Sequence, residues 1–216
     1  IDKLKASGVE IKTDFVVGRN RKLKDLIEKD GYDAVFVGTG AGLPMFMGIE
    51  GENLVGVFSA NEYLTRANLM RAYEKGKADT PIFPSHKVAV LGGGNVAMDA
   101  ARMAVRLGAE KVSVVYRRTE VEMPARKEEV AHAKEEGIDF LFLQNAKRIL
   151  GTEDGRVKAI ECLRYELGEP DSSGRRRPVV IPNSEFTLDV DTVIVAIEKG
   201  SKPLIRQTTN ELTVNK

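Results

Sequence analysis

An apolar run that leads directly into three glycines constrains the fold of this chain more than any other feature. Residues 88–91 read VAVL, which is typical of a strand buried on both faces, and residues 92–94 are all glycine. Residues 96–101 read VAMDAA and continue as a helix of small side chains. A buried strand that turns through glycines into a helix is the first unit of a dinucleotide-binding fold, and we expect one here.

Each position in this turn has its own expected role in binding a nucleotide. Gly92 permits the tight turn, Gly94 lets a pyrophosphate approach the backbone, and Ala97 lets the helix pack closely on the strand. The N–H groups at the start of the helix attract phosphate together with the helix dipole. We place Asp99 in the first turn, where its carboxylate complements that dipole rather than acting as an acid or base. The predicted phosphate-binding residues are Gly92, Gly93, Gly94, Asn95, Val96 and Ala97, with a purely structural glycine turn as the alternative.

The segments around this turn alternate between strand and helix patterns, which predicts a parallel sheet with helical crossovers. After residue 146 the pattern becomes that of an antiparallel hairpin, followed by a polar loop over residues 168–178 and two further strands. The expected fold class is therefore α/β, a Rossmann-like three-layer dinucleotide-binding domain with an antiparallel β insertion. The predicted elements are strands 87–91, 111–116, 139–143, 147–150, 157–167, 185–188 and 191–197 and helices 95–107 and 125–136.

The N-terminal segment carries weaker signals. Residues 9–17 have a strand-like pattern, and residues 23–29 have that of a short amphipathic helix. Residues 33–37 predict a buried strand that leads into a glycine cluster at residues 38–42. Glycines at the end of a buried strand indicate a tight turn or the close approach of another group to the backbone.

A helix and a linker separate this segment from the glycine turn. The helix is expected over residues 59–75, with Ser59 as its N-cap and Glu62 completing a capping box. Residues 80–85 contain two prolines and are predicted to form a linker.

The residues after the second strand of the unit favour NADP over NAD. An NAD site usually ends this strand with an acidic residue that binds the ribose 2′-hydroxyl, whereas an NADP site places arginine near the 2′-phosphate. Here Arg117 and Arg118 follow the strand, with Arg126 further along, and guanidinium groups match phosphate in charge and geometry. Because Glu120 and Glu122 lie close by, NAD and a solvated basic turn stay open as alternatives.

The composition disfavours several other classes of protein. The 33 basic and 32 acidic residues nearly cancel, so we expect neither a nucleic-acid nor a membrane partner. One cysteine and two widely separated histidines are too few for a structural metal site. No apolar stretch approaches the roughly 20 residues that a membrane span needs, and the first residues have no signal-peptide pattern, so a cytoplasmic location is expected.

Four short motifs resemble those of one flavoprotein family. They are YRRTE at residues 116–120, MPAR at 123–126, LGEPD at 167–171 and SGRR at 173–176. On these motifs the chain resembles, over nearly its whole length, the small (beta) subunit of NADPH-dependent glutamate synthase and related FAD- and NAD(P)-dependent oxidoreductases. The resemblance implies hydride transfer from NADPH to FAD, followed by single-electron transfer through iron–sulfur clusters toward a partner subunit. Such a reaction depends on positioning more than on an acid or base, so no catalytic residue is predicted.

The same resemblance implies a division of the chain, since in that family an FAD domain is interrupted by an NADPH domain. Residues 1–58 would be a partial FAD-domain segment, residues 59–195 the NAD(P)-binding domain and residues 196–216 the return segment. It also implies further cofactor-binding residues: Gly38, Thr39 and Gly40 on the flavin side, and Ala196 and Ile197 beside the nicotinamide.

Three departures from the family pattern shape the expected function. The glycine-rich FAD fingerprint and the closing flavin-binding segment would lie outside residues 1–216, as would a cysteine-rich cluster domain, and Glu198 stands where the resemblance implies glycine. We therefore expect this chain to bind NADP(H) but not FAD, and not to turn over alone. A flavin-free nucleotide-binding regulatory module is the alternative. A thioredoxin-reductase type of enzyme is disfavoured because the Cys-x-x-Cys motif is missing.

Overall fold

The computed structural model describes residues 1–74, 76–172, 174–197, 200 and 203–213. The chain divides into two compact units. The central unit comprises residues 44–199, and the terminal unit comprises residues 1–43 together with 200–216. The assignment of the flanking segments to an FAD domain stays a prediction.

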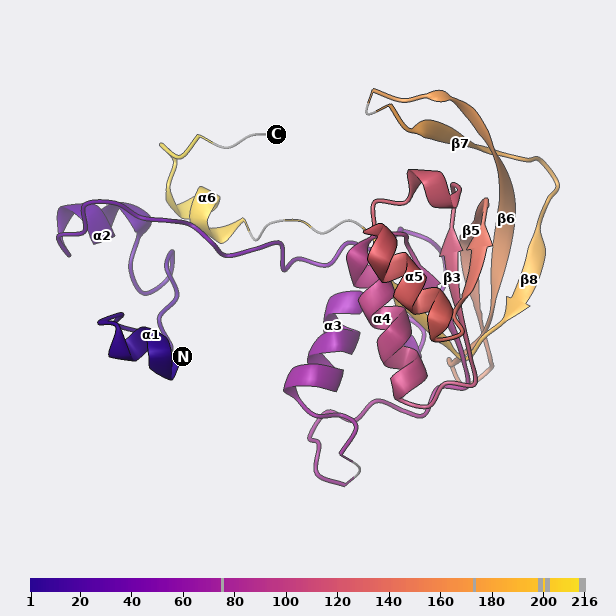
Figure 1. The fold of residues 1–216 in the computed structure, drawn as a ribbon, viewed down its shortest axis with the longest axis horizontal. Coiled ribbons are helices and arrows are strands. Elements are labelled where there is room, and N and C mark those ends of the chain that lie inside the picture. The colour runs from indigo at the N-terminus through magenta and orange to yellow at the C-terminus, as the bar shows by residue number, and fades with distance from the viewer. Residues whose placement is uncertain (75, 173, 198–199, 201–202, 214–216) are drawn as a thin grey trace. The chain divides into compact units, whose positions relative to one another are not determined.

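A five-stranded parallel sheet forms the middle of the central unit (Figure 1). Its strands are β1 (Val57–Ser59), β2 (Lys87–Leu91), β3 (Lys111–Tyr116), β4 (Asp139–Phe142) and β9 (Thr192–Val195). They lie in the order β1-β9-β2-β3-β4, and every pairing is parallel. The predicted parallel sheet is thus confirmed, with β1 as an added edge strand whose three residues are too short to give a periodic signal.

Helices cover one face of this sheet and antiparallel strands cover the other. The helices are α3 (Ala60–Leu64), α4 (Asn95–Arg106) and α5 (Lys127–Glu135), which lie together in Figure 1. Side chains of β2 alternate between the two faces, as the pleat of a strand requires. Val88 and Val90 belong to the core on the helical side, whereas Ala89 and Leu91 belong to the core against the antiparallel strands. The three-layer α/β fold class is confirmed.

The antiparallel layer is built around one long strand. It contains β5 (Gln144–Gly151), β6 (Val157–Pro170), β7 (Arg176–Val180) and β8 (Phe186–Asp189). The first part of β6 pairs with β5 and β8, and its last part pairs only with β7. We call this two-stranded ribbon, residues 165–180, the arm; it extends beyond the rest of the layer in Figure 1.

The arm corrects the prediction of a polar loop over residues 168–178. Tyr165 pairs with Val180 and Leu167 with Pro178, so most of the predicted loop is strand. Pro170 disfavours a strand locally, yet it pairs with Arg176 of β7 across a register shift that lies between Leu167 and Pro170.

The helix after β1 is shorter than predicted. Ser59 caps α3 as expected, because its Oγ accepts the Glu62 N–H at 3.2 Å, but the Glu62 carboxylate accepts from Arg66 at 2.7 Å instead of closing a capping box. A π-helix over Thr65–Leu69 follows α3. Arg71 adopts φ of +51°, a left-handed conformation that ends helices, so the predicted extension to residue 75 is wrong; residue 75 itself lies outside the described residues.

The terminal unit contains the short helices α1 (Asp2–Ala6), α2 (Leu23–Glu28) and α6 (Leu204–Thr208). The helix predicted at residues 23–29 is confirmed. The strands predicted at 9–17 and 33–37 are wrong, since the described residues of this unit form no strand and Phe36 is 95% exposed. An apolar run becomes a strand only where a neighbour accepts its backbone hydrogen bonds, and no such neighbour is present in the described part of the unit.

Candidate nucleotide site

The glycine turn connects β2 to α4 at the carboxyl edge of the parallel sheet. Gly92 adopts φ of +146° and donates its N–H to the Val115 carbonyl at 3.2 Å. A Cβ at this position would overlap the Ala196 carbonyl oxygen, so packing as well as φ requires glycine. Ala196 in turn donates its N–H to the Leu91 carbonyl at 2.9 Å. The predicted nicotinamide residue Ala196 therefore lies directly beside the turn.

The second glycine is also explained by packing. A Cβ on Gly93 would approach the Tyr116 ring to 2.7 Å. The ring is held in place because the Tyr116 hydroxyl donates to the Glu122 carbonyl at 2.9 Å. Tyr116, at the end of β3, thus packs against the glycine turn at Gly93.

The third glycine has no such explanation within the described chain. Gly94 is the N-cap of α4 with φ of −93°, which any residue adopts, and no described atom lies within 4 Å of a Cβ placed there. Among the described residues, no acceptor binds the backbone N–H groups of residues 94–96. Ala97, the next residue in the turn, is fully buried against the sheet. The turn therefore has open space at Gly94 and three successive backbone N–H groups without an acceptor among the described residues.

The start of α5 is attached to this turn. Asn95 Oδ1 accepts the backbone N–H of Arg126 at 2.8 Å, and the Gly93 carbonyl accepts the N–H of Ala125 at 3.1 Å. Arg126 is the N-cap of α5, and its side chain is exposed. Two hydrogen bonds therefore bring an exposed arginine beside the open side of the turn.

The two arginines after β3 have different surroundings. Arg117 is exposed, whereas the Arg118 side chain is only 8% exposed. Arg118 Nε donates to the Arg176 carbonyl at 2.7 Å, and its Nη2 donates to the Asp171 carboxylate at 2.9 Å. Arg118 therefore binds the tip of the arm, and Arg117 is the arginine of the pair that faces solvent.

The two carboxylates near this segment are both engaged by protein groups. Glu122 ends a 3-10 turn (Glu120–Glu122) and accepts from the N–H and hydroxyl of Thr119. Burial on its own would raise the pKa of Glu122, but these hydrogen bonds and the nearby Arg176 hold the pKa below its usual 4.5. Both oxygens of Glu120 accept from Lys134, at 2.8 and 2.7 Å.

The nicotinamide-side residues predicted from the resemblance, Ala196 and Ile197, directly follow β9. Ala196 and Ile197 line a shallow hollow together with Ser59 and Asn61. Glu198, which departs from the family pattern, lies outside the described residues. Gly38, Thr39 and Gly40 are exposed residues of the terminal unit, in a segment without regular structure.

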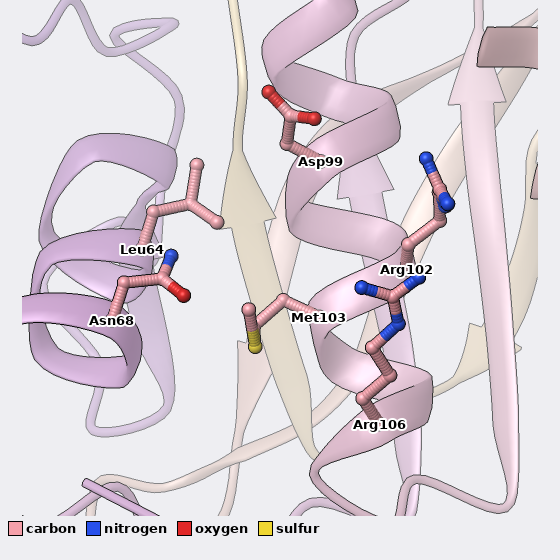
Figure 2. A pocket seen from close by; sticks show the side chains of 6 residues that line it. All are labelled: Leu64, Asn68, Asp99, Arg102, Met103 and Arg106. Carbon is pink, nitrogen blue, oxygen red and sulfur yellow. The ribbon is translucent and has the colours of Figure 1, made fainter. Parts of the chain in front are cut away.

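A separate hollow lies between α4 and the π-helix that follows α3 (Figure 2). Its volume is about 180 Å³, which is below the roughly 300–1,000 Å³ of typical cofactor sites. Leu64 and Asn68 lie on one side of it, and Asp99 and Met103 of α4 lie on the other. Because α4 begins at Asn95, Asp99 is its fifth residue, so the predicted first-turn position is wrong and the helix has no acidic residue in its first turn.

Sequence reasoning missed Asp171, Arg176 and Thr119. Asp171 and Arg176 belong to motifs that carried the resemblance, yet their contact with Arg118 joins positions 53 and 58 residues apart, which no local pattern reveals. Thr119 and Glu122 have the spacing of a capping box, a signal that could have been found.

Comparison with known proteins shows the family to which the chain belongs. A family model described as pyridine nucleotide-disulphide oxidoreductase matches residues 2–215. The chain belongs to this family. Members are enzymes, and the curated relatives include NADPH-dependent oxidoreductases.

Three curated relatives illustrate the range of the family. The NADPH glutamate synthase small chain of Halomonas elongata is 43% identical over 190 residues, covering 88% of this chain and 39% of the relative. The β subunit of NADP(+)-dependent formate dehydrogenase from Moorella thermoacetica is 43% identical over 93% of this chain and 27% of its own length. The β subunit of NADPH-Fe(3+) oxidoreductase from Geobacter sulfurreducens is 42% identical over 91% of this chain and 28% of its own. The chain thus spans less than half of each.

Solved structures share the fold at low identity. The Mycobacterium tuberculosis oxidoreductase FprA, solved in complex with NADPH, matches with a TM-score of 0.69 and 20% identity, over 88% of this chain and 54% of that one. Thioredoxin reductase from Lactococcus lactis matches with a TM-score of 0.52 and 17% identity, over 76% of this chain and 45% of that one. Among the described residues, none of the helices has the length and apolar character to cross a membrane.

Proposed function

We propose that the central unit binds NADPH at the glycine turn, as the pyridine-nucleotide part of a glutamate synthase small-subunit-like flavoprotein oxidoreductase. The observation that carries this proposal is Gly94. Neither its φ nor its surroundings require glycine, while the adjacent N–H groups lack acceptors among the described residues. A diphosphate that approaches the backbone closely would account for both.

The proposed diphosphate site follows from the roles of the turn residues. Gly92 and Gly93 let the backbone turn against Ala196 and Tyr116. The N–H groups of Gly94, Asn95 and Val96 donate to phosphate oxygens, and the N-terminal end of the α4 dipole adds to the attraction. Ala97 keeps α4 close to the sheet, so these donors stay aimed at the ligand.

The surroundings of the acidic and basic side chains favour NADPH over NADH. Glu122 and Glu120, which could have bound a ribose 2′-hydroxyl, are held by Thr119 and Lys134. Arg117 and Arg126 are exposed at the end of β3 and beside the turn, where a 2′-phosphate would meet guanidinium groups. We assign these two arginines to the 2′-phosphate, with Arg118 holding the segment that carries Arg117.

The nicotinamide end of the proposed site lies at Ala196 and Ile197. Bound NADPH would supply a hydride at this end of the site, and in the whole protein the proposed acceptor is FAD, with iron–sulfur clusters and a partner subunit as the proposed acceptors of single electrons. We assign no side chain an acid or base role, because hydride transfer depends on distance and orientation. The backbone contact between Ala196 and Gly92 fixes the nicotinamide wall relative to the diphosphate donors.

We propose that this chain does not retain FAD by itself. Residues 33–42, which include the predicted flavin-side residues Gly38, Thr39 and Gly40, form no strand–turn–helix that could hold a flavin diphosphate. The partner subunit and the iron–sulfur clusters belong to the whole protein in this proposal. Support for them comes from the resemblance and from relatives whose names describe subunits of larger enzymes.

Titration of the chain with NADPH, NADH and FAD tests the proposal through nicotinamide fluorescence and flavin absorbance. NADPH should bind saturably and at least about ten-fold more tightly than NADH, the difference expected for one charge-assisted contact to the 2′-phosphate. Arg117→Ala should remove most of that preference. Arg106→Ala is the matched control, since this exposed arginine lies at the other end of α4.

Three results would contradict the proposal. They are equal affinity for the two nucleotides, a preference for NADPH that survives Arg117→Ala, and stoichiometric FAD retained after gel filtration. Nucleotide binding followed by reduction of an added acceptor would also contradict the claim that the chain does not turn over alone.

A further inference from the structure

The tip of the arm is attached to the segment that follows β3. The attachment consists of the two hydrogen bonds from Arg118, at 2.7 Å to the Arg176 carbonyl and at 2.9 Å to the Asp171 carboxylate. It joins the antiparallel layer to the edge of the parallel sheet at which the proposed nucleotide site lies.

The turn of the arm has hydrogen bonds of its own besides those from Arg118. Its turn closes through the Asp171 N–H, which donates to the Arg175 carbonyl at 2.7 Å, and through Asp171 Oδ1, which accepts the Arg175 N–H at 3.3 Å. Arg176 donates its side chain back to the carbonyls of Gly168 and Leu167. The bonds from Arg118 are therefore additional to those within the turn, and they attach it to the segment after β3.

Burial makes this attachment depend on charge. The side chains of Arg118 and Asp171 are 8% and 22% exposed, so the guanidinium is nearly removed from water beside a partly shielded carboxylate. A buried charge that loses its partner is strongly disfavoured. Removing the negative charge of Asp171 should therefore release Arg118 from its position beneath the arm.

The position of Arg118 also affects the direction of the adjacent Arg117 side chain. Arg117 and Arg118 are joined by one peptide bond; Arg117 is exposed and Arg118 is buried. As long as Arg118 is held inward by the arm, the adjoining side chain is presented outward at the end of β3.

We propose that Asp171 is a positioning residue for NADPH selection, because its ion pair with Arg118 fixes the arm to the end of β3 and keeps Arg117 directed at the 2′-phosphate. This inference rests on the proposed NADPH site. It adds to that site Asp171, a residue of the antiparallel layer.

Asp171→Asn tests the inference closely, since the amide oxygen retains the turn acceptor for the Arg175 N–H, while the negative charge and the second oxygen, which accepts from Arg118, are lost. The dissociation constants for NADPH and 2′,5′-ADP should rise about ten-fold, the loss expected for one charge-assisted contact. Binding of NADH and 5′-AMP should stay near the wild-type value, because neither carries the 2′-phosphate. Asp171→Glu should restore most of the selectivity.

Asp154→Asn is the matched control. Asp154 lies in the tight turn between β5 and β6, where its carboxylate accepts from Thr152, so it is another turn aspartate far from Arg118 in sequence. This variant should keep both affinities. Arg118→Lys is a second test variant, because it keeps the charge but lacks the guanidinium fork, and it should lose the same selectivity as Asp171→Asn.

The outcomes separate this inference from the proposed function. A wild-type chain that binds no NADPH contradicts the nucleotide site itself. Wild-type selectivity that persists in folded Asp171→Asn and Arg118→Lys variants contradicts only the positioning role. An equal loss of NADPH and NADH binding in those variants would show a merely structural contact and would likewise overturn the inference.

Discussion

Asn95 Oδ1 accepts the backbone N–H of Arg126 at 2.8 Å, across 31 positions of sequence. This bond connects the first residue of α4 to the N-cap of α5. A second bond, from the Ala125 N–H to the Gly93 carbonyl at 3.1 Å, joins the same two segments. The glycine turn and the basic segment after β3 are therefore one structural group, although they lie on different crossovers of the sheet.

Two substitutions at Asn95 separate its structural role from its place at the proposed phosphate site. Asn95→Ala removes the acceptor for the Arg126 N–H and should lower the free energy of unfolding by about 1 kcal/mol. Asn95→Asp keeps the acceptor but adds a negative charge, so it should unfold like the wild type and bind NADPH at least about ten-fold more weakly. Urea unfolding and NADPH titration measure the two effects. Tight NADPH binding by the aspartate variant would argue against a phosphate at this turn.

Gly92→Ala should destabilise the central unit severely. The new Cβ would meet the Ala196 carbonyl at a φ of +146°, so both packing and backbone conformation oppose it. The expected loss is about 3 kcal/mol, by overpacking together with backbone strain. Chemical denaturation measures this loss, and a midpoint equal to that of the wild type would contradict the described turn.

The stability of the wild type should fall at acid pH, in part through Glu122. Since its pKa is lowered in the folded state, its contribution is present above the usual value of 4.5 and is lost as the pH falls through the folded-state pKa. Glu122→Gln should therefore be less stable at neutral pH and lose less stability between neutral pH and about pH 4. Urea unfolding at both pH values checks this expectation. Equal pH dependence in the two proteins would show that Glu122 makes no such contribution.

The sheet and the glycine turn were predictable because their signals are local. The apolar runs at 87–91 and 111–116 are bounded by residues that end strands, so both strands appear with the predicted bounds. Helix α4 begins at Asn95 as predicted, directly after the three glycines. Gly92 to Ala97 form the predicted turn, whereas nucleotide binding there stays a prediction.

The remaining features depend on partners far away in the sequence. The strand character of Pro170 comes from pairing with Arg176 of β7, against its own preference. The sequence alone does not distinguish Arg118 from Arg117. The ion pair of Arg118 with the distant Asp171 explains why Arg118 is buried while Arg117 is exposed. Phe36 lies in an apolar run that resembles a buried strand, yet no described strand pairs with it.

Gly94→Ala tests the central claim most directly. The position has φ of −93° and open space around a Cβ, so the variant should unfold at the wild-type midpoint or slightly above it, because alanine restricts the unfolded chain. If a diphosphate lies against this backbone, the added methyl group takes the space that the diphosphate would fill. NADPH should then bind at least about ten-fold more weakly. NADPH titration of the folded variant is the decisive measurement. Loss of NADPH affinity at unchanged stability is the predicted result, and wild-type affinity in Gly94→Ala would contradict the assignment of the glycine turn as the nucleotide site.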